Sequence, residues 1–425
     1  MRKFALDISP LRKYRELRLL FASGMITRLG SAMTMVALPF QIKVLTNSYV
    51  AVGLMGIVQL VPLIIFGLYG GVLADSVDRK KMILLAEASS LVMTLVLFLN
   101  ALLPNPHIVI LYIVGAAFAA LSGLSAPSLG AILPRIVSHE DMAASNALMG
   151  LRWQFGAILG PSIGGLIVST AGVATGYALD VISYVLSLIF IILLRPVPAG
   201  EKSTPPNLRS LLDGLQYAIS RKDLLGTYLV DLSAMFFAMP TALFPFWADS
   251  LHARWALGLF YSAGTVGAMI TTLTSGWMKN YPHHGRAVMW AAIGWGASIS
   301  LAGTFNSLFM VLFFLTLAGA SDEISALFRS LIWNQSIADE YRGRLGGIEL
   351  LSYSVGPLGG QMRAGSMAAW TNLRTSVVSG GLLCIGFVVL AASALPKFRN
   401  YDVRTNQHVL SKEMSAKNSQ DSNEK

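Results

Sequence analysis

Long apolar runs separated by short polar turns dominate the pattern of this chain. Most runs extend for about 20 residues or more, the helical length that crosses a bilayer core of ~30 Å. A polar stretch after the sixth run divides the set into two groups of six. We expect twelve membrane-spanning helices, at residues 19–45, 49–74, 82–103, 108–133, 143–171, 173–194, 224–247, 256–278, 287–304, 308–332, 345–369 and 375–395.

The composition supports an all-α, polytopic membrane protein. Hydrophobic residues make up 54% of the 425 residues and charged residues only 13%. The mean hydropathy is +0.60, whereas a soluble domain carries about 25% charged residues. The single cysteine, Cys384, lies within an apolar run, so no intramolecular disulfide can form.

The distribution of Lys and Arg predicts that both termini are cytoplasmic. Alternate polar segments, beginning with residues 1–18, carry most of the positive charge, whereas the loops between them carry Arg254 and Arg374. Cytoplasmic loops of membrane proteins have this excess of Lys and Arg. The net charge of +10 is therefore spread over short loops and tails, which argues against a nucleic-acid-binding surface.

The two halves of the chain carry a similar motif. Gly160–Gly165 in the fifth predicted span has a counterpart in Gly356–Gly360 in the eleventh. Parallel repeats of six spans predict two six-helix bundles related by a pseudo-two-fold axis, with a substrate site between them, as in transporters. The predicted organisation is an N-terminal bundle at 1–195, a cytoplasmic linker with a short amphipathic helix at 196–223, a C-terminal bundle at 224–396 and a disordered cytoplasmic tail at 397–425.

A short charged loop joins the second and third spans. It runs from Gly71 through Asp75 to Arg79 and Lys80. Small residues in this loop let two helix ends approach closely. We expect Asp75 to lie against a helix N-terminus of the other half, where the helix dipole stabilises it, and the loop to act in gating.

The fifth span carries small residues at every fourth position. Gly156, Gly160 and Gly164 share one helix face, Gly165 adjoins it, and Pro161 frees a backbone carbonyl and favours a kink. The spacing predicts a helix-packing seam. Bending of this seam during transport is a further hypothesis.

These features together resemble the major facilitator superfamily. The motif from Gly156 to Gly165 resembles the one typical of its proton-driven exporters, and the segments 37–42, 70–86 and 99–106 look like the bacterial enterobactin exporter family. The resemblance covers nearly the whole chain. It implies alternating access through a central cavity lined by spans one, four, seven and ten.

Charged side chains inside the spans are the candidate site residues. An ionised group at the bilayer centre costs ~2.5–3.5 kcal/mol on insertion scales unless it faces a partner or water. Asp322 and Glu323 in span ten are the candidate proton carriers, with Asp231 in span seven as a third. The candidate groups for binding an acidic substrate are the intramembrane arginines Arg28, Arg152, Arg329 and Arg363.

Structural roles for some of these charges stay open. Asp231 could cap a helix, Glu323 could form a structural ion pair, and Arg152 could lock the two halves together near the cytoplasmic side. Glu87 and Asp180, in spans three and six, are expected to serve packing or loop anchoring.

The predicted function is proton-coupled export of a siderophore similar to enterobactin, or of a similar secreted metabolite, across the bacterial inner membrane. The alternative is multidrug efflux of amphipathic drugs, with the carboxylates of spans seven and ten binding cations. The expected partners are a small-molecule substrate, protons and the lipid bilayer, with an outer-membrane channel as a further candidate and no nucleic acid.

No enzymatic activity, cofactor or metal site is expected. The pair His283 and His284 has no cysteine or carboxylate at ligand spacing. A phosphate-binding loop of the Gly-x4-Gly-Lys-Ser/Thr type does not occur, which argues against direct ATP drive.

Overall fold

The computed structural model describes residues 7–76, 78–196, 216–217, 219–337, 339–407 and 409–410. The described regular structure is helical, and the chain divides into two compact units. Unit 1 comprises Met1–Pro206 and Thr241–Ser262, and unit 2 comprises Asn207–Pro240 and Ala263–Lys425. The predicted amphipathic helix of the linker lies mostly outside the described residues.

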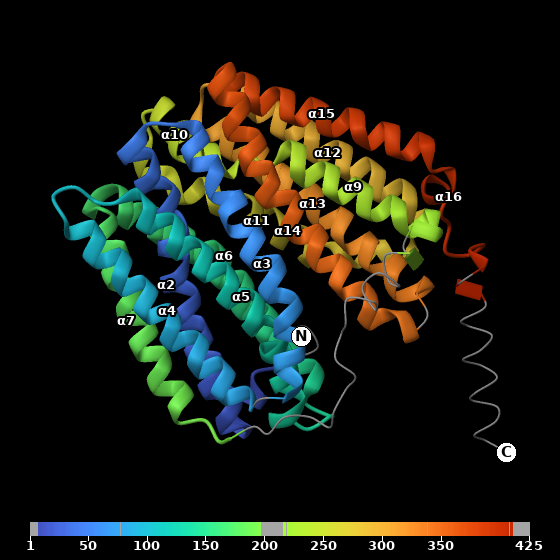
Figure 1. The fold of residues 1–425 in the computed structure, drawn as a ribbon. Coiled ribbons are helices and arrows are strands. Elements are labelled where there is room, and N and C mark those ends of the chain that lie inside the picture. The colour runs from blue at the N-terminus through green and yellow to red at the C-terminus, as the bar shows by residue number, and fades with distance from the viewer. Residues whose placement is uncertain are drawn as a thin grey trace. The chain divides into compact units, whose positions relative to one another are not determined.

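The helices of unit 1 follow the predicted spans closely (Figure 1). Lipid offers no hydrogen-bond partners to the backbone, and a helix satisfies its backbone N–H and C=O groups internally. Gly172, with φ of +87°, makes the tight turn between the fifth and sixth spans in a conformation that suits glycine. The helices are α1 (Ser9–Lys13), α2 (Arg15–Thr46), α3 (Tyr49–Ser76), α4 (Arg79–Leu102), α5 (Ile108–Ile136), α6 (Met142–Ala171) and α7 (Val173–Ile192).

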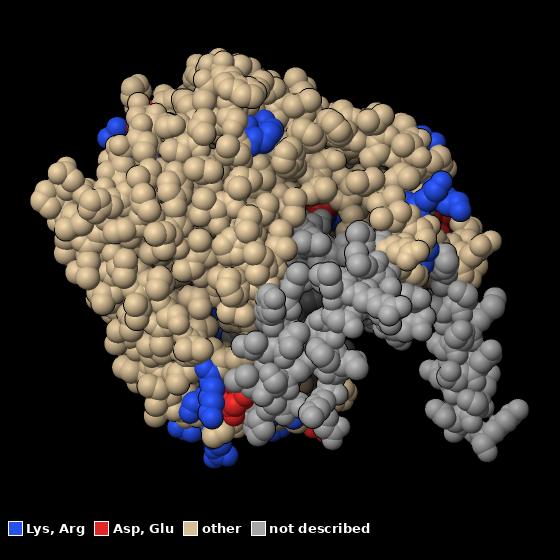
Figure 2. All heavy atoms as spheres, in the orientation of Figure 1, with Lys and Arg blue, Asp and Glu red and all other residues tan. Residues whose placement is uncertain are grey.

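Contacts within unit 1 define its bundle. Helix α2 packs against α6 and α7, α3 packs against α5, and α4 packs against α5 and α7. Figure 2 shows that the middle of the visible face over these helices is almost free of charged side chains. This surface suits contact with lipid.

Unit 2 contains the remaining spans. Among the described residues, eleven helical stretches are long and apolar enough to cross a membrane. The predicted span at 345–369 falls within a further helix, α14, which has 32 residues. The helices are α9 (Lys222–Ala238), α11 (Leu257–Leu273), which begins in unit 1, the 3₁₀ helix η4 (Ser275–Asn280), α12 (His284–Thr304), α13 (Leu308–Ser336), α14 (Asp339–Trp370), α15 (Leu373–Ala394) and α16 (Pro396–Arg399).

The predicted span at 224–247 is interrupted by a proline. Helix α9 ends at Ala238, and Met239 is extended, as is usual before a proline such as Pro240. Short helical segments follow, namely η2 (Thr241–Leu243), α10 (Phe244–Ser250) and η3 (Arg254–Ala256). These segments belong to unit 1, although they come from the second half of the sequence.

The beginning of the expected disordered tail is instead packed within unit 2. Phe398 is 0% exposed and lies against Gly226 of α9, where an added Cβ would approach the Phe398 ring to 2.2 Å. Tyr401 is buried, and its carbonyl accepts a hydrogen bond from Gly285 N–H at 3.4 Å. Aromatic side chains that cover a helix glycine account for the difference. Residues 411–425 lie outside the described residues.

A small ion cluster outside the spans accompanies this packed segment. Asp402 Oδ2 lies 3.2 Å from His283 Nδ1, and Arg404 donates to both carboxylate oxygens at 3.0 and 2.7 Å. The Arg404 guanidinium holds the pKa of Asp402 well below its usual range. The cluster connects the C-terminal segment to the turn before α12.

We predict that Phe398→Ala destabilises the protein by about 3–5 kcal/mol, because it leaves a cavity over α9. The melting temperature of the purified protein in detergent measures the effect. Arg399→Ala removes an exposed neighbour and serves as the control. Equal melting temperatures for the two variants would contradict a packed C-terminal segment.

Candidate functional site

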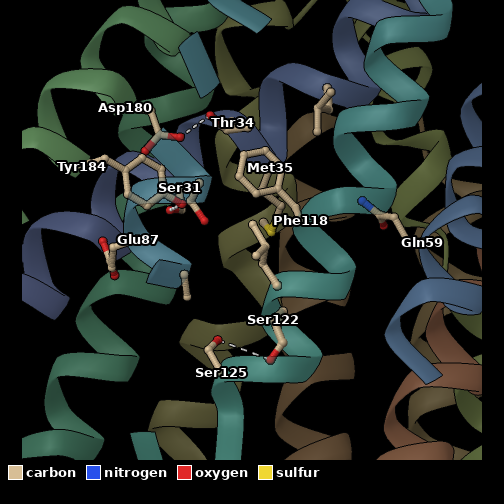
Figure 3. A pocket seen from close by; sticks show the side chains of 14 residues that line it. Ser31, Thr34, Met35, Gln59, Glu87, Phe118, Ser122, Ser125, Asp180 and Tyr184 are labelled. Atoms are coloured by element: carbon tan, nitrogen blue, oxygen red, sulfur yellow. Dashed lines mark hydrogen bonds between the residues drawn. The ribbon is translucent and has the colours of Figure 1, made fainter. Parts of the chain in front are cut away.

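A pocket of about 350 Å³ lies within unit 1, among helices α2, α3, α4, α5 and α7. In the view of Figure 3, Glu87, Asp180 and Tyr184 lie on one side, Gln59 lies on the opposite side, and Phe118 lies between them. The volume is at the lower end of the range for small-molecule sites, ~300–1,000 Å³. The pocket is therefore large enough for a small organic group.

Two carboxylates form the polar side of this pocket, and their described hydrogen-bond donors are neutral. Asp180 is 0% exposed and accepts hydrogen bonds from Thr34 Oγ1 at 2.5 Å and Ser183 Oγ at 3.0 Å. Glu87 Oε2 accepts from Thr27 Oγ1 at 3.1 Å and from Ser187 Oγ at 3.0 Å. Within the described parts of the chain, neither carboxylate forms an ion pair.

Apolar side chains form the other side of the pocket. Met35, Leu38, Phe118 and Leu121 line it from α2 and α5. The sequence predicts packing or loop-anchoring roles for Glu87 and Asp180, and this pocket was not predicted. A single carboxylate in each of two apolar spans was the available signal, but the sequence does not show that both carboxylates face one cavity.

The charged residues of span ten lie in unit 2, where one of them forms a buried ion pair. Asp231 of α9 pairs with Arg329 of α13, and their side chains are 4% and 3% exposed. Glu323 Oε1 accepts a hydrogen bond from Thr272 Oγ1 of α11 at 2.9 Å. Asp322 precedes it on α13. The structure thus brings Asp231 together with Arg329, a pairing that the sequence analysis did not specify.

Two of the predicted substrate-binding arginines are held by neighbouring helices. Arg152 Nη1 of α6 donates to the carbonyl of Leu20 in α2 at 2.9 Å. Arg363 Nη1 of α14 donates to the carbonyl of Ser376 in α15 at 3.2 Å. Each guanidinium thereby links two helices of its own unit.

Arg28 has a different environment. Its side chain is exposed, and its guanidinium carbon lies 5.8 Å from the centre of the Trp153 ring. No described carboxylate forms an ion pair with it. Among the four predicted arginines, Arg28 is the one that leaves its guanidinium available to a ligand.

The predicted gating loop is shorter than expected because α3 continues to Ser76. Gly71 and Asp75 lie within α3 and Arg79 begins α4, while their side chains lie outside the described residues. Lys80 Nζ donates to the carbonyls of Ile192, at 2.8 Å, and Leu194. This positive charge at the end of α7 is favourable because carbonyls at a helix C-terminus carry partial negative charge.

The small face of α6 lies directly against α2. An added Cβ at Gly156 would approach Arg28 Cγ to 2.1 Å, and one at Gly160 would approach Ala32 Cβ to 2.5 Å. Gly164 lies against Met33 in the same way. The motif helix of unit 1 therefore packs against the first span at close range.

The same motif of α6 also packs against the beginning of α11. An added Cβ at Gly165 would lie 2.1 Å from Gly258 N, and the Pro161 carbonyl is equally close to a Cβ built on Gly258. Ser162 Oγ donates to Ser262 Oγ at 2.8 Å. In unit 2, the counterpart motif of α14 places Gly360 against the backbone of α9.

An ion cluster joins α2 to the segment after Pro240. Lys43, in the last turn of α2, pairs with Asp249 of α10. Arg254 donates to both oxygens of Asp249 at 2.6 and 3.1 Å. The Lys43 side chain is only 10% exposed. Lys43 lies within the predicted span 19–45, where hydropathy alone gives no sign of this ion cluster.

The chain forms two helical units, and its eleven described candidate spans together with α14 make twelve. One unit contains a pocket lined by carboxylates of the predicted spans. These features are those of a multi-pass transporter of the major facilitator type. The chain matches the model of the transmembrane secretion effector family over residues 5–423, and it belongs to that family. This finding confirms the predicted fold class and superfamily.

Named relatives support the same assignment. The enterobactin exporter EntS of Escherichia coli O1:K1 / APEC is 29% identical over 393 residues, which cover 91% of this chain and 93% of the relative. The enterobactin exporter EntS of Shigella boydii serotype 18 has the same identity and coverage. The chain is thus similar to siderophore exporters along almost its whole length.

Solved transporter structures share the fold. The nucleoside transporter NupG matches with a TM-score of 0.70 and 13% identity, covering 91% of this chain and 99% of that one. A bacterial homologue of the iron transporter ferroportin, in an inward-facing state, matches with a TM-score of 0.67 and 15% identity, covering 91% and 98%. At these identities the likeness shows the fold alone.

We predict that Gly165→Ala lowers the melting temperature in detergent, because the new methyl group would collide with the backbone at Gly258. Gly150→Ala is the matched control, since an added Cβ at Gly150 meets nothing within 4 Å in the same helix. The control should be neutral or stabilising by up to about 1 kcal/mol, owing to the higher helix propensity of alanine. A similar response of both variants would contradict the close contact.

Proposed function

We propose that this bacterial membrane protein exports a siderophore, or a similar secreted metabolite, by proton-coupled alternating access. The observation that carries this proposal is the 29% identity to enterobactin exporters over 91% of the chain. Family membership and the multi-pass fold support transport of a small molecule. The proposed location is the inner membrane with both termini cytoplasmic, and an outer-membrane channel is the proposed partner for onward passage.

The proposed proton carrier is Asp322 or Glu323. The charge of Asp231 is neutralised by Arg329. Protonation of Asp231 would break this buried ion pair and leave Arg329 without its counter-charge, which is strongly unfavourable. Glu323 accepts its described hydrogen bond from a neutral hydroxyl, that of Thr272. Glu323 can therefore take up and release a proton without disrupting that pair, and Asp322 adjoins it on α13. Asp231, the third candidate, is proposed to hold Arg329 in place.

The proposed contact for an acidic group of the substrate is Arg28. Its guanidinium is exposed next to the Trp153 ring, which provides an apolar and π-rich neighbour. Arg152 and Arg363 are proposed to contribute indirectly, by holding helices together through backbone carbonyls. Asp75, with Gly71, Arg79 and Lys80, keeps its proposed gating role.

Multidrug efflux is the second candidate function. The observation that favours it is the unit 1 pocket, which is lined by two carboxylates on one side and by apolar side chains on the other. Such a pocket suits an amphipathic cation. Secretion and drug resistance therefore need to be measured together.

We predict that deletion of the gene reduces siderophore in the medium under iron starvation, while inhibitory concentrations of lipophilic cationic drugs stay unchanged. Secreted siderophore is quantified by chromatography, and re-expression of the intact chain is the control. Normal secretion combined with heightened drug sensitivity would overturn the siderophore assignment and favour multidrug efflux.

We also predict that Asp322→Asn or Glu323→Gln abolishes proton-driven flux in vesicles, because the amide cannot exchange a proton. The measurement is substrate movement in response to an imposed pH gradient. Asp141→Asn, which changes a carboxylate outside the predicted spans, is the matched control. Unchanged flux in both span-ten variants would show that the coupling proton binds elsewhere.

A further inference from the structure

The geometry points to the unit 1 pocket as a ligand-binding site for an amphipathic molecule that donates hydrogen bonds or carries positive charge. In this assignment Glu87 is the acceptor, the buried Asp180 contributes its negative charge from behind the pocket surface, and Phe118 with Met35 forms the apolar side. The inference rests on the proposed export function in one respect, namely that the ligand is the transported molecule. It differs from recognition of an acidic group by Arg28, because Arg28 does not line this pocket.

The carboxylates have acceptor capacity that the protein does not use. An ionised carboxylate offers about four lone-pair positions. The two described hydrogen bonds to Glu87 both reach Oε2, so Oε1 accepts none from the described residues. Asp180 is fully buried and already accepts a hydroxyl on each oxygen, so the open acceptor position is Glu87 Oε1. A ligand with N–H or O–H groups can supply the missing donors.

Charge balance within unit 1 favours the same class of ligand. Arg152 is the cation that acts electrostatically on Glu87, but its guanidinium donates to the carbonyl of Leu20 and forms no ion pair with that carboxylate. Tyr184, which also faces the carboxylates, is hydrogen-bonded to Ser31 at 2.9 Å. Two acidic groups with neutral donors repel an anion and attract a cation or a neutral donor.

The opposite side of the pocket selects for an apolar surface. Phe118 and Leu121 line it from α5, and Met35 lines it from α2. Methionine adapts its shape to different partners, and an aromatic ring can stack on a flat ligand. Gln59 adds an amide that can donate or accept at the far side. A ligand with a flat apolar part and a donor-bearing edge would satisfy both sides.

Two ligand types share this chemistry, and binding experiments separate them. The full chain is purified in detergent and titrated with 4-methylcatechol, a neutral ring that carries hydroxyl donors, and with tetraphenylphosphonium, a cation without donors. Calorimetry gives the dissociation constants for the wild type, Glu87→Gln and Asp180→Asn. Glu16→Gln, a carboxylate at the start of α2 outside the pocket, is the matched control.

We expect the wild type to bind at least one probe, and each pocket substitution to weaken that binding about tenfold or more. For 4-methylcatechol this is the range for hydrogen bonds to charged groups, and for tetraphenylphosphonium the loss is that of a charge interaction in a desolvated site. Loss confined to tetraphenylphosphonium identifies a cation site, whereas loss of 4-methylcatechol binding identifies a donor site. Unchanged affinity in both variants, or no binding of either probe by the folded wild type, overturns the inference.

A second variant covers the case in which Asp180→Asn does not fold. Ser122→Trp adds bulk from an exposed position on the lining of the pocket and changes neither carboxylate. It should abolish probe binding without lowering the melting temperature. Retained binding in this variant counts against the pocket.

Secretion by the same variants separates failure of this inference from failure of the proposed function. If gene deletion stops siderophore secretion while Glu87→Gln and Asp180→Asn secrete normally, the pocket assignment fails and the function stands. If deletion leaves secretion unchanged while probe binding depends on Glu87 and Asp180, the pocket stands and the siderophore function fails.

Discussion

Close approach of helix backbones is the constraint on which the rest of this structure depends. Lipid tails are as apolar as the side chains they would replace, so helices in a membrane gain little from apolar burial and associate through tight packing. The seam of Gly156, Gly160 and Gly164 brings α6 against α2, and Gly360 does the same for α14 and α9. A methyl group at any of these positions would meet atoms at under 3 Å, so glycine is required by contact rather than by backbone conformation.

Tight packing also explains how polar groups are accommodated. At these separations short hydroxyl side chains can reach the next helix, as Ser23 reaches Ser187 at 2.8 Å. Charged groups are treated in three ways: Asp231 has an ion-pair partner, Arg152 has a backbone carbonyl, and Glu87 has hydroxyl donors. The second and third arrangements both leave the charge of the group without a paired opposite charge, and the third occurs where the helices of unit 1 leave a cavity.

The helices and the seam could be predicted from the sequence because each depends on a local pattern. Apolar runs gave the spans to within a few residues, and the four-residue glycine spacing gave the face of α6. The interruption at Pro240 was missed because the segments on both sides are apolar, so hydropathy continues across the break. Phe398 was assigned to a disordered tail because its covering of Gly226 involves residues far apart in sequence. Glu87 and Asp180 were undervalued for the same reason.

The interleaving of the two units has a consequence for biosynthesis. Unit 1 includes Thr241–Ser262, which the ribosome makes only after the linker and helix α9 of unit 2. Domains usually fold in the order of synthesis, from the N-terminus onward. Here the first unit cannot gain its Lys43 to Asp249 ion pair, or the contact of Gly165 with Gly258, until translation has entered the second half. The first six helices are therefore complete in the membrane before the rest of unit 1 has been synthesised. A gene divided at the linker would encode a first product without residues Thr241–Ser262 of unit 1.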